Sequence, residues 1–387
     1  MKVMKRIKQW LNESWLCPYM QKVRRLDYII YYKYFCRRNK VDKKTVLMAS
    51  DSRETLGGNL KFLDTELKSR GYKVTYFLKK SLNEIKTKEE KKELCKMMAE
   101  AAYILLDDFY PIIYALPIRK ETKVIQVWHA MGAFKTVGFS RIGKPGGPNP
   151  RSLSHKNYSA TITSSDFIRE NYAEAFGISL DKVYATGIPR TDVLFNEEYK
   201  KKTQKRLYEK YPQLKEKKVI LFAPTFRGNG QKTAYYDFQW IDFERIREEF
   251  SEKYCFVVKM HPFVHNIDEI PEDDNFYLNM TQERDINDLL LITDILITDY
   301  SSVIFEGALL DINTIFYVPD LDEYVASRDF YYPFEEYMFG KLAKTKEELV
   351  EAIRNPENID EKRETFKKKF CSACDGKSTK RVVDMLF

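Results

Sequence analysis

The sequence predicts an α/β protein built from two doubly wound domains, and three observations lead to this prediction. At 387 residues the chain is long for a single hydrophobic core and suits two. From residue 44 onward, short apolar runs alternate with amphipathic stretches, which is typical of a parallel sheet flanked by helices. A charged stretch near residues 196–218 interrupts this alternation, and a second series of the same kind follows it.

The first domain is predicted over residues 44–196. Its strands are expected at residues 44–50, 73–78, 103–108, 124–130, 160–165 and 182–188. Residues 60–71 have the pattern of an amphipathic helix that Gly71 closes. Ligands of open α/β sheets bind beyond the carboxyl ends of the strands, so polar residues directly after these strands are the candidates for a site.

The second domain is predicted over residues 197–370, and residues 371–387 are expected to form a C-terminal helix that closes a cleft between the domains. Strands are expected at residues 219–226, 254–260, 274–280, 294–300 and 313–318. Helices are expected between them at residues 241–254, 285–293 and 302–310. The second half therefore repeats the architecture of the first without repeating its sequence.

The N-terminal segment, residues 1–43, is basic and amphipathic. Residues 1–44 hold 13 Lys and Arg against three acidic residues, a balance of +10 that leaves −2 for the rest of a chain of net charge +8. Trp10 and Trp15 alternate with these cations, and no apolar run is long enough to span a bilayer. We expect peripheral attachment to an anionic membrane; the alternative is a helical pair packed on the protein's own core. A nucleic acid partner is not expected, because no recognition motif is present.

Two of the four histidines lie at the ends of predicted strands, His129 near the end of residues 124–130 and His261 directly after residues 254–260. Imidazole titrates near neutral pH, so a histidine at such a place can act as a general base. The small-residue turn after His129 brings Lys135 within reach of a phosphate. The alternative for either histidine is a structural, hydrogen-bonded role.

The segment DYSSVIFEGALL places a strand end directly before an apolar helix. Ser301 and Ser302, after Asp299, either cap this helix or help to hold a diphosphate. Glu306 is the one charged residue from Val303 to Leu310, and it is placed to accept hydrogen bonds from ribose hydroxyls.

Further cations follow strands in both halves. APTFRG places Thr225 and Arg227 at a strand end, and GIPRTD places Arg190 and Asp192 at another. Together with Lys259 and Lys135, these arginines are expected to neutralise a pyrophosphate, unless they form interdomain ion pairs instead. No acidic cluster suited to magnesium stands nearby, so we expect neither a metal nor another cofactor. The six scattered cysteines predict no disulfide framework.

Six motifs in order resemble the CDP-glycerol glycerophosphotransferase family of teichoic acid synthesis. They are WHAMGAFKTVGF, GIPRTD, FAPTFRG, KMHPF, TDYSSVIFEGALL and FCSACDGKSTKRV. The resemblance implies a GT-B fold with two Rossmann-like domains and a cleft, and attachment to the cytoplasmic face of the plasma membrane in a Gram-positive bacterium. It implies His129 as the base and Arg227, His261, Ser301, Ser302 and Glu306 as donor-binding residues. Asp375 and Gly376 match an Asp-Gly pair that closes over the donor.

The resemblance further implies transfer of a polyol phosphate from CDP-glycerol or CDP-ribitol to an undecaprenyl-diphosphate-linked acceptor, with release of CMP. WHAMGAFK departs from the Trp-His-Gly-Thr-Pro-Leu-Lys of many members and resembles the primase and ribitol-phosphate branch, so the polyol is left open. Two alternatives remain: a sugar-nucleotide glycosyltransferase or epimerase, and a catalytically silent membrane scaffold. Assembly into a homo-oligomer is also left open.

Overall fold

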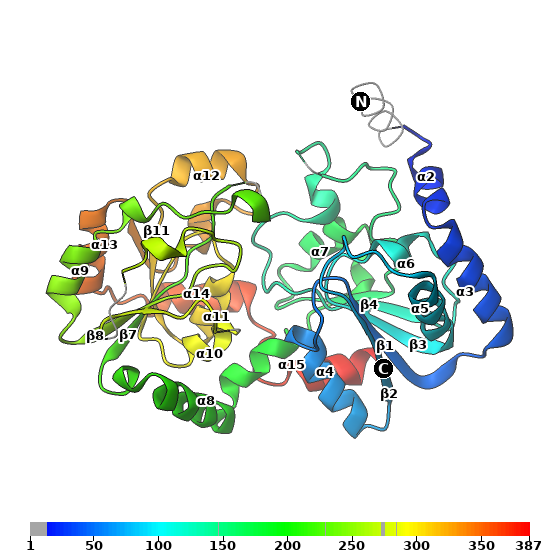
Figure 1. Cartoon of the computed structure of the whole chain (residues 1–387), viewed down its shortest axis with the longest axis horizontal. Coiled ribbons are helices and arrows are strands. Elements are labelled where there is room, and N and C mark those ends of the chain that lie inside the picture. The colour runs from blue at the N-terminus through cyan, green and yellow to red at the C-terminus, as the bar shows by residue number, and fades with distance from the viewer. Residues whose placement is uncertain (1–13, 146, 229, 272–274, 284) are drawn as a thin grey trace. The chain divides into compact units, whose positions relative to one another are not determined.

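The computed structural model describes residues 14–387 except 146, 229, 272–274 and 284. The chain divides into two compact α/β units (Figure 1). The first unit comprises the chain up to Asp192 together with the C-terminal residues Ala373–Phe387. The second unit comprises Val193–Ser372. The first unit thus includes the N-terminal helices and the C-terminal helix that we had set apart as segments of their own.

The first unit is organised around a parallel sheet in the order β2-β1-β3-β4-β5-β6. Its strands are β1 (Asp42–Ser50), β2 (Lys73–Leu78), β3 (Ala101–Leu106), β4 (Lys123–Gln126), β5 (Ala160–Ile162) and β6 (Val183–Tyr184). The strand order reverses between β1 and β3, so a crevice is expected beyond the carboxyl ends of these two strands. β3 and the second half of β1, Val46–Ala49, are apolar and almost wholly buried because the central strands of a doubly wound sheet are buried on both faces.

The helices of the first unit surround this sheet. They are α2 (Cys17–Val23), α3 (Leu26–Arg38), α4 (Gly58–Ser69), α5 (Lys88–Glu100), α6 (Pro111–Ala115), α7 (Arg169–Phe176) and α15 (Ser378–Leu386). α3 lies along α5, where Tyr28 and Tyr32 are buried and Asp27 forms an ion pair with Lys91 (2.7 Å). One face of α3 therefore packs on the core of this unit.

The second unit contains a parallel sheet in the order β12-β11-β10-β7-β8-β9. Its strands are β7 (Lys218–Phe222), β8 (Tyr254–Val258), β9 (Tyr277–Asn279), β10 (Ile295–Thr298), β11 (Asn313–Tyr317) and β12 (Lys341–Ala343). The first strand of the unit, β7, lies beside the fourth, β10, which is the strand order of the dinucleotide-binding Rossmann fold. The switch point of this sheet lies between β7 and β10.

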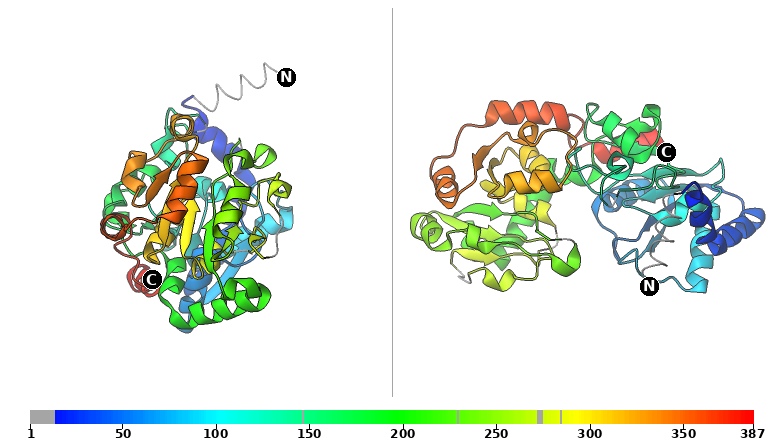
Figure 2. Two further views of the ribbon diagram at one scale, coloured as in Figure 1. Left: turned by 90° about the vertical axis from the view of Figure 1, so that its left-hand side faces the viewer. Right: turned by 90° about the horizontal axis from the view of Figure 1, so that it is seen from above.

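Helices cover both faces of the second sheet, as Figure 2 shows. They are α8 (Glu197–Lys210), α9 (Phe243–Phe250), α10 (Ile286–Leu290), α11 (Val303–Leu309), α12 (Leu321–Ser327), α13 (Lys346–Arg354) and α14 (Asp360–Phe370). Ile220 and Phe222 of β7 join one hydrophobic cluster, and Val219 and Leu221 join another on the opposite face. This alternation follows from the two-residue period of a strand.

Short 3-10 helices occur in the connections, at Gly138–Arg141, Leu180–Lys182, Pro189–Phe195, Pro212–Lys215, Gln231–Thr233, Phe238–Trp240, Ile267–Glu269 and Phe334–Tyr337. All six cysteines are free thiols. Within the described ranges, no helix has both the length and the apolar composition needed to cross a bilayer.

The predicted fold class, two Rossmann-like α/β halves, is confirmed. Each predicted strand has a counterpart in the sheets. Trp10 lies outside the described residues, and the membrane role of the N-terminal segment stays a prediction.

Candidate functional site

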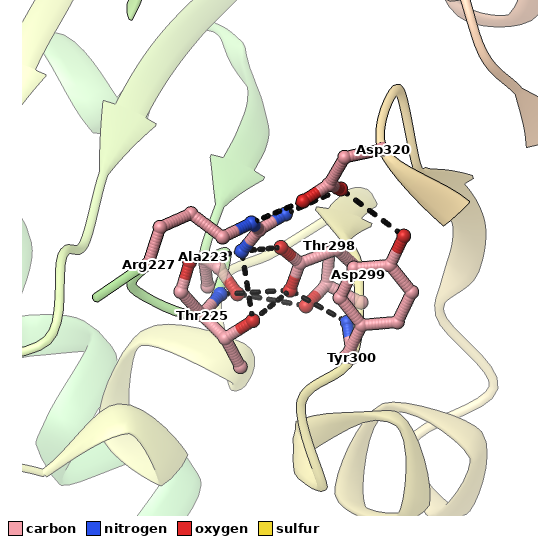
Figure 3. A network of polar contacts seen from close by, with 7 residues as sticks. All are labelled: Ala223, Thr225, Arg227, Thr298, Asp299, Tyr300 and Asp320. Atoms are coloured by element: carbon pink, nitrogen blue, oxygen red, sulfur yellow. Dashed lines mark hydrogen bonds and ion pairs between the residues drawn. The ribbon is translucent and has the colours of Figure 1, made fainter. Parts of the chain in front are cut away.

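The switch point of the second sheet holds a network of polar contacts centred on Asp299 (Figure 3). Asp299 follows β10 and is fully buried. Its Oδ1 accepts hydrogen bonds from the backbone N–H of Thr225 (2.7 Å), the Thr225 hydroxyl (2.9 Å) and the backbone N–H of Tyr300 (2.6 Å). One carboxylate therefore fixes the turn after β7 and the turn after β10.

Arg227 joins this network, although we had expected it to bind phosphate. Its Nε and Nη2 donate to the two carboxylate oxygens of Asp320 (2.6 and 2.9 Å), and its Nη1 donates to Asp299 Oδ2 (3.0 Å). The side chain is 8% exposed. Burial opposes its charge, but the attraction of Asp299 and Asp320 outweighs burial and raises the pKa of the guanidinium. In this structure Arg227 is a buried link between the loops rather than an open anion site.

Aromatic rings enclose the guanidinium of Arg227. Its Cζ lies 5.0–5.7 Å from the ring centroids of Tyr236, Trp240, Tyr300 and Tyr324. Tyr300 and Tyr324 stack with centroids 3.7 Å apart, and the Tyr300 hydroxyl donates to Asp320 (3.1 Å). Cation–π attraction adds to the ion pairs in such an enclosure.

The predicted serines and Glu306 lie at the start of α11 and within it. Ser301 Oγ accepts a long hydrogen bond from the Val303 N–H (3.4 Å), and Ser302 occupies the N-cap position without a side-chain cap bond. Capping of α11 therefore uses little of the hydrogen-bonding capacity of these two hydroxyls. Glu306 is buried on α11, where a carboxylate usually has a partner.

Lys259 and His261 follow β8, the neighbour of β7. Lys259 is buried and its Nζ donates to the Thr281 carbonyl (3.1 Å); burial lowers the pKa of this amine. His261 is exposed, and its ring contacts those of Phe226 and Phe263, with centroids 5.0 and 4.5 Å away. Its Nδ1 accepts from the Phe263 N–H (3.2 Å), which fixes the orientation of the imidazole.

In the first unit, His129 lies just beyond β4, and 47% of its side chain is exposed. Its Nδ1 lies 3.7 Å from Oδ2 of Asp108, which follows the neighbouring strand β3. Its ring lies against Trp128, with centroids 4.5 Å apart. The carboxylate thus faces one ring nitrogen of an imidazole that solvent and a ligand can reach.

The switch point of the first sheet carries two ion pairs whose carboxylates are buried. Lys86 contacts Asp51 (2.8 Å) and Arg53 contacts Asp107 (2.6 Å). Burial raises the pKa of both carboxyl groups. These pairs secure the loops after β1 and β3, and β3 is the neighbour of β4, the strand that leads to His129.

The other residues predicted on the acceptor side have structural contacts. Both carboxylate oxygens of Asp192 accept backbone N–H groups at the start of α15, from Ser378 (2.9 Å) and Thr379 (2.7 Å). Asp192 therefore caps the returning C-terminal helix. The backbone N–H of Arg190 donates to Asn59 Oδ1 (3.0 Å), and Lys135 is partly buried.

Asp375 and Gly376 lie in the first unit, whereas the other predicted donor residues lie in the second. Asp375 forms an ion pair with Arg381 (2.6 Å), and Gly376 adopts a φ of 82° that favours glycine. A Cβ on Gly187 of the GIPRTD motif would lie 2.2 Å from the Ala373 carbonyl oxygen. Only a glycine at this position therefore allows the backbone near Ala373 to approach so closely.

A family model described as CDP-Glycerol:Poly(glycerophosphate) glycerophosphotransferase matches residues 30–387. The chain belongs to this family. It is 46% identical over 349 residues to the teichoic acid poly(ribitol-phosphate) polymerase of Bacillus spizizenii, covering 89% of this chain and 56% of that protein. It is 44% identical to the ribitol-phosphate polymerase TarK of Staphylococcus aureus, covering 89% and 68%. The chain therefore spans little more than half of the Bacillus relative.

Identity is lower to the poly(glycerol phosphate) polymerase of Bacillus spizizenii, 31% over 300 residues, covering 75% of each chain. Among solved structures, a variant of the wall teichoic acid polymerase TagF matches with a TM-score of 0.77 at 22% identity, covering 95% of this chain and 96% of that one. Another TagF variant was soaked with CDPG. The fold of this glycerophosphotransferase family member is thus of the GT-B type.

Several residues of the site were missed from the sequence. Four side chains contact residues near a strand end, but no sequence motif identifies them. Asp320 contacts Arg227, Asp108 faces His129, and the amides of Asn59 and Gln126 bond to the backbone of Trp128. In the described residues, no group of three or more His, Cys, Asp and Glu side chains is arranged to hold a metal ion.

Proposed function

We propose that this chain transfers ribitol phosphate from CDP-ribitol to a hydroxyl group of a lipid-linked teichoic acid precursor and releases CMP. The observation that carries the choice of polyol is the difference in identity: 46% and 44% to two ribitol-phosphate polymerases against 31% to a glycerol-phosphate polymerase. Glycerol phosphate is the second candidate, because a TagF variant was soaked with CDPG.

His129 is the proposed general base. Asp108 faces its Nδ1, which leaves Nε2 to take the proton of the acceptor hydroxyl. The acceptor oxygen then forms a bond to the β-phosphorus of the donor, and the bond from that phosphorus to the bridging oxygen breaks. CMP leaves with the electron pair of that bond, so one phosphoanhydride is exchanged for one phosphodiester.

The donor is proposed to bind at the carboxyl ends of β8 and β10. His261, Ser301 and Ser302 offer an imidazole and two hydroxyls there, and buried Lys259 adds a positive charge behind them. Glu306 is proposed to accept the ribose hydroxyls. Arg227 acts through the loops that it holds, because its guanidinium already pairs with two carboxylates.

Release of CMP from CDP-ribitol in the presence of a lipid-linked acceptor tests this proposal. The His129→Ala variant is expected to lose about 10² to 10⁴-fold in rate, the usual effect of removing a general base. His265→Ala is the matched control, since it removes an exposed histidine of the second unit to which we assign no role. Near-normal turnover by His129→Ala would show that the base is wrongly assigned. Binding to liposomes without any CMP release would support the silent scaffold instead.

We also propose that α2 and α3 attach the protein to an anionic membrane surface. Large apolar side chains are exposed at intervals of four along each helix region: Trp15, Tyr19 and Val23, then Leu26, Ile30 and Tyr34. Exposed cations flank them at Lys22, Arg24, Lys33, Arg37 and Arg38. This combination suits the headgroup layer of an anionic bilayer.

Substitution tests the membrane proposal better than deletion, because removing residues 1–40 would also remove the buried Tyr28 and Tyr32. The triple variant Trp15→Ser, Tyr19→Ser and Ile30→Ser is expected to stop sedimenting with phosphatidylglycerol vesicles and to keep its turnover of a soluble acceptor. The control is Ile85→Ser, which removes a 91% exposed apolar side chain of the same unit. Unchanged sedimentation of the triple variant would refute the attachment.

A further inference from the structure

The turn that carries His129 has an unfavourable backbone conformation. Trp128, directly before His129, adopts a φ of 48°, in the left-handed region that bulky residues rarely occupy. Such a conformation persists only where the surrounding structure enforces it, and it is common at functional sites. Two buried amide side chains, Gln126 and Asn59, supply the contacts that enforce it here.

Gln126, the last residue of β4, is fully buried. Its Oε1 accepts the backbone N–H of Trp128 (2.9 Å), and its Nε2 donates to the Asp108 carbonyl (3.0 Å) and the Tyr158 hydroxyl (2.9 Å). One side chain therefore sets the distance between the peptide of Asp108 and the turn that carries His129.

Asn59 approaches the same turn from α4 and is 1% exposed. Its Nδ2 donates to the carbonyls of Val127 (2.9 Å) and Trp128 (2.7 Å), so both amide protons are used. Its Oδ1 accepts the backbone N–H of Arg190 (3.0 Å). Asn59 thus joins the His129 turn to the loop after β6.

We propose that Asn59 and Gln126 are positioning residues, which hold the imidazole of His129 beside Asp108 and in the orientation that accepts the proton. This inference rests on the proposed role of His129 as the base. A shift of about 1 Å in a catalytic group can cost about 10²-fold in rate, so the two amides are expected to affect kcat rather than KM.

Asn59→Asp is the sharpest change, because it keeps the size of the side chain and the acceptor for Arg190 while it removes both donors to the turn. We expect kcat for CMP release to fall about 10 to 100-fold, with KM for CDP-ribitol changed less than about threefold. Gln126→Glu, which keeps Oε1 and loses the Nε2 donor, is expected to act in the same direction and serves as the second variant.

The chain offers a closely matched control in Asn157→Asp. Asn157 Nδ2 also donates to two backbone carbonyls, those of Ile113 (2.7 Å) and Leu116 (2.9 Å), but it secures the end of α6 rather than the His129 turn. Its variant is expected to lose thermal stability and to keep its kcat.

A double-mutant cycle separates positioning from a merely structural role. If Asn59 acts through His129, Asn59→Asp should reduce the residual rate of His129→Ala by less than about twofold. An equal fall in both backgrounds, or an Asn59→Asp enzyme with normal kcat, would overturn the positioning role and leave the base assignment intact. Normal turnover by His129→Ala alone would overturn the base assignment and the positioning role together.

Discussion

The network at the second switch point makes a quantitative prediction about stability. Arg227 is one cation that faces two carboxylates, Asp299 and Asp320, and its side chain is 8% exposed while theirs are 0% and 12% exposed. Removing one partner of a buried ion pair usually costs about 3–5 kcal/mol, because the other charge is left without compensation. The two possible removals differ here, since the cluster contains an excess carboxylate.

Asp320→Asn leaves Arg227 paired with Asp299, so the remaining charges balance. It weakens the hydrogen bonds to Arg227 and Tyr300, and we expect a loss of about 2 kcal/mol in the free energy of unfolding. Arg227→Met leaves Asp299 and Asp320 facing each other without a cation, and we expect a loss of about 4 kcal/mol.

Urea denaturation measures both losses when it is followed by tryptophan fluorescence in a background that keeps Trp240 and replaces the other three tryptophans. Trp240 lies in the second unit, 5.3 Å from the guanidinium of Arg227, so its emission reports on this part of the fold. Arg247→Met, at an exposed position on α9, is the matched control and should change the midpoint little. Equal losses for Asp320→Asn and Arg227→Met, or a loss below about 0.5 kcal/mol in both, would refute the charge-balance reasoning.

Three further predictions concern pH, the donor and metal ions. Burial lowers the pKa of His155 to about 4, so the unfolded chain binds this proton more readily and stability falls as the pH drops below about 6.5. The loss by pH 5 should be about 2 kcal/mol, and urea titrations at pH 7.5 and 5 should show a smaller loss in His155→Gln. Glu306→Gln should raise KM for CDP-ribitol about tenfold in steady-state assays, and an unchanged KM would exclude a ribose contact. Dialysis against EDTA should leave the rate of CMP release unchanged, because the proposed donor site takes its positive charge from Lys259; a loss restored by magnesium would contradict this.

The strands could be predicted well because buried parallel strands form continuous apolar runs. Leu47 to Ala49 of β1 and Val219 to Phe222 of β7 are buried, as their composition indicated. β12 was missed because Lys341–Ala343 is only three residues long and lies at the sheet edge, where no apolar run is required. The predicted helix at residues 241–254 ends at Phe250, since the chain turns there to begin β8.

Sequence also located polar residues at strand ends, but it did not show which of them pair. Arg227 meets Asp320, 93 positions later, because strand order places the loops after β7 and β11 on either side of β10. Asp192 caps a helix that begins 186 positions later. A charged side chain directly after a strand is therefore a sound candidate for a ligand-binding site. Whether it can bind a ligand depends on whether another side chain or backbone group of the protein already pairs with it.

Mass spectrometry of the products from one lipid-linked acceptor, offered CDP-ribitol and CDP-glycerol together, tests the central claim most directly. We predict that the acceptor gains ribitol phosphate in amounts that match the CMP released, and that His129→Ala gives neither. Incorporation of glycerol phosphate alone would show that the polyol is wrong. An unmodified acceptor in the presence of active, folded protein would contradict polyol-phosphate transfer itself.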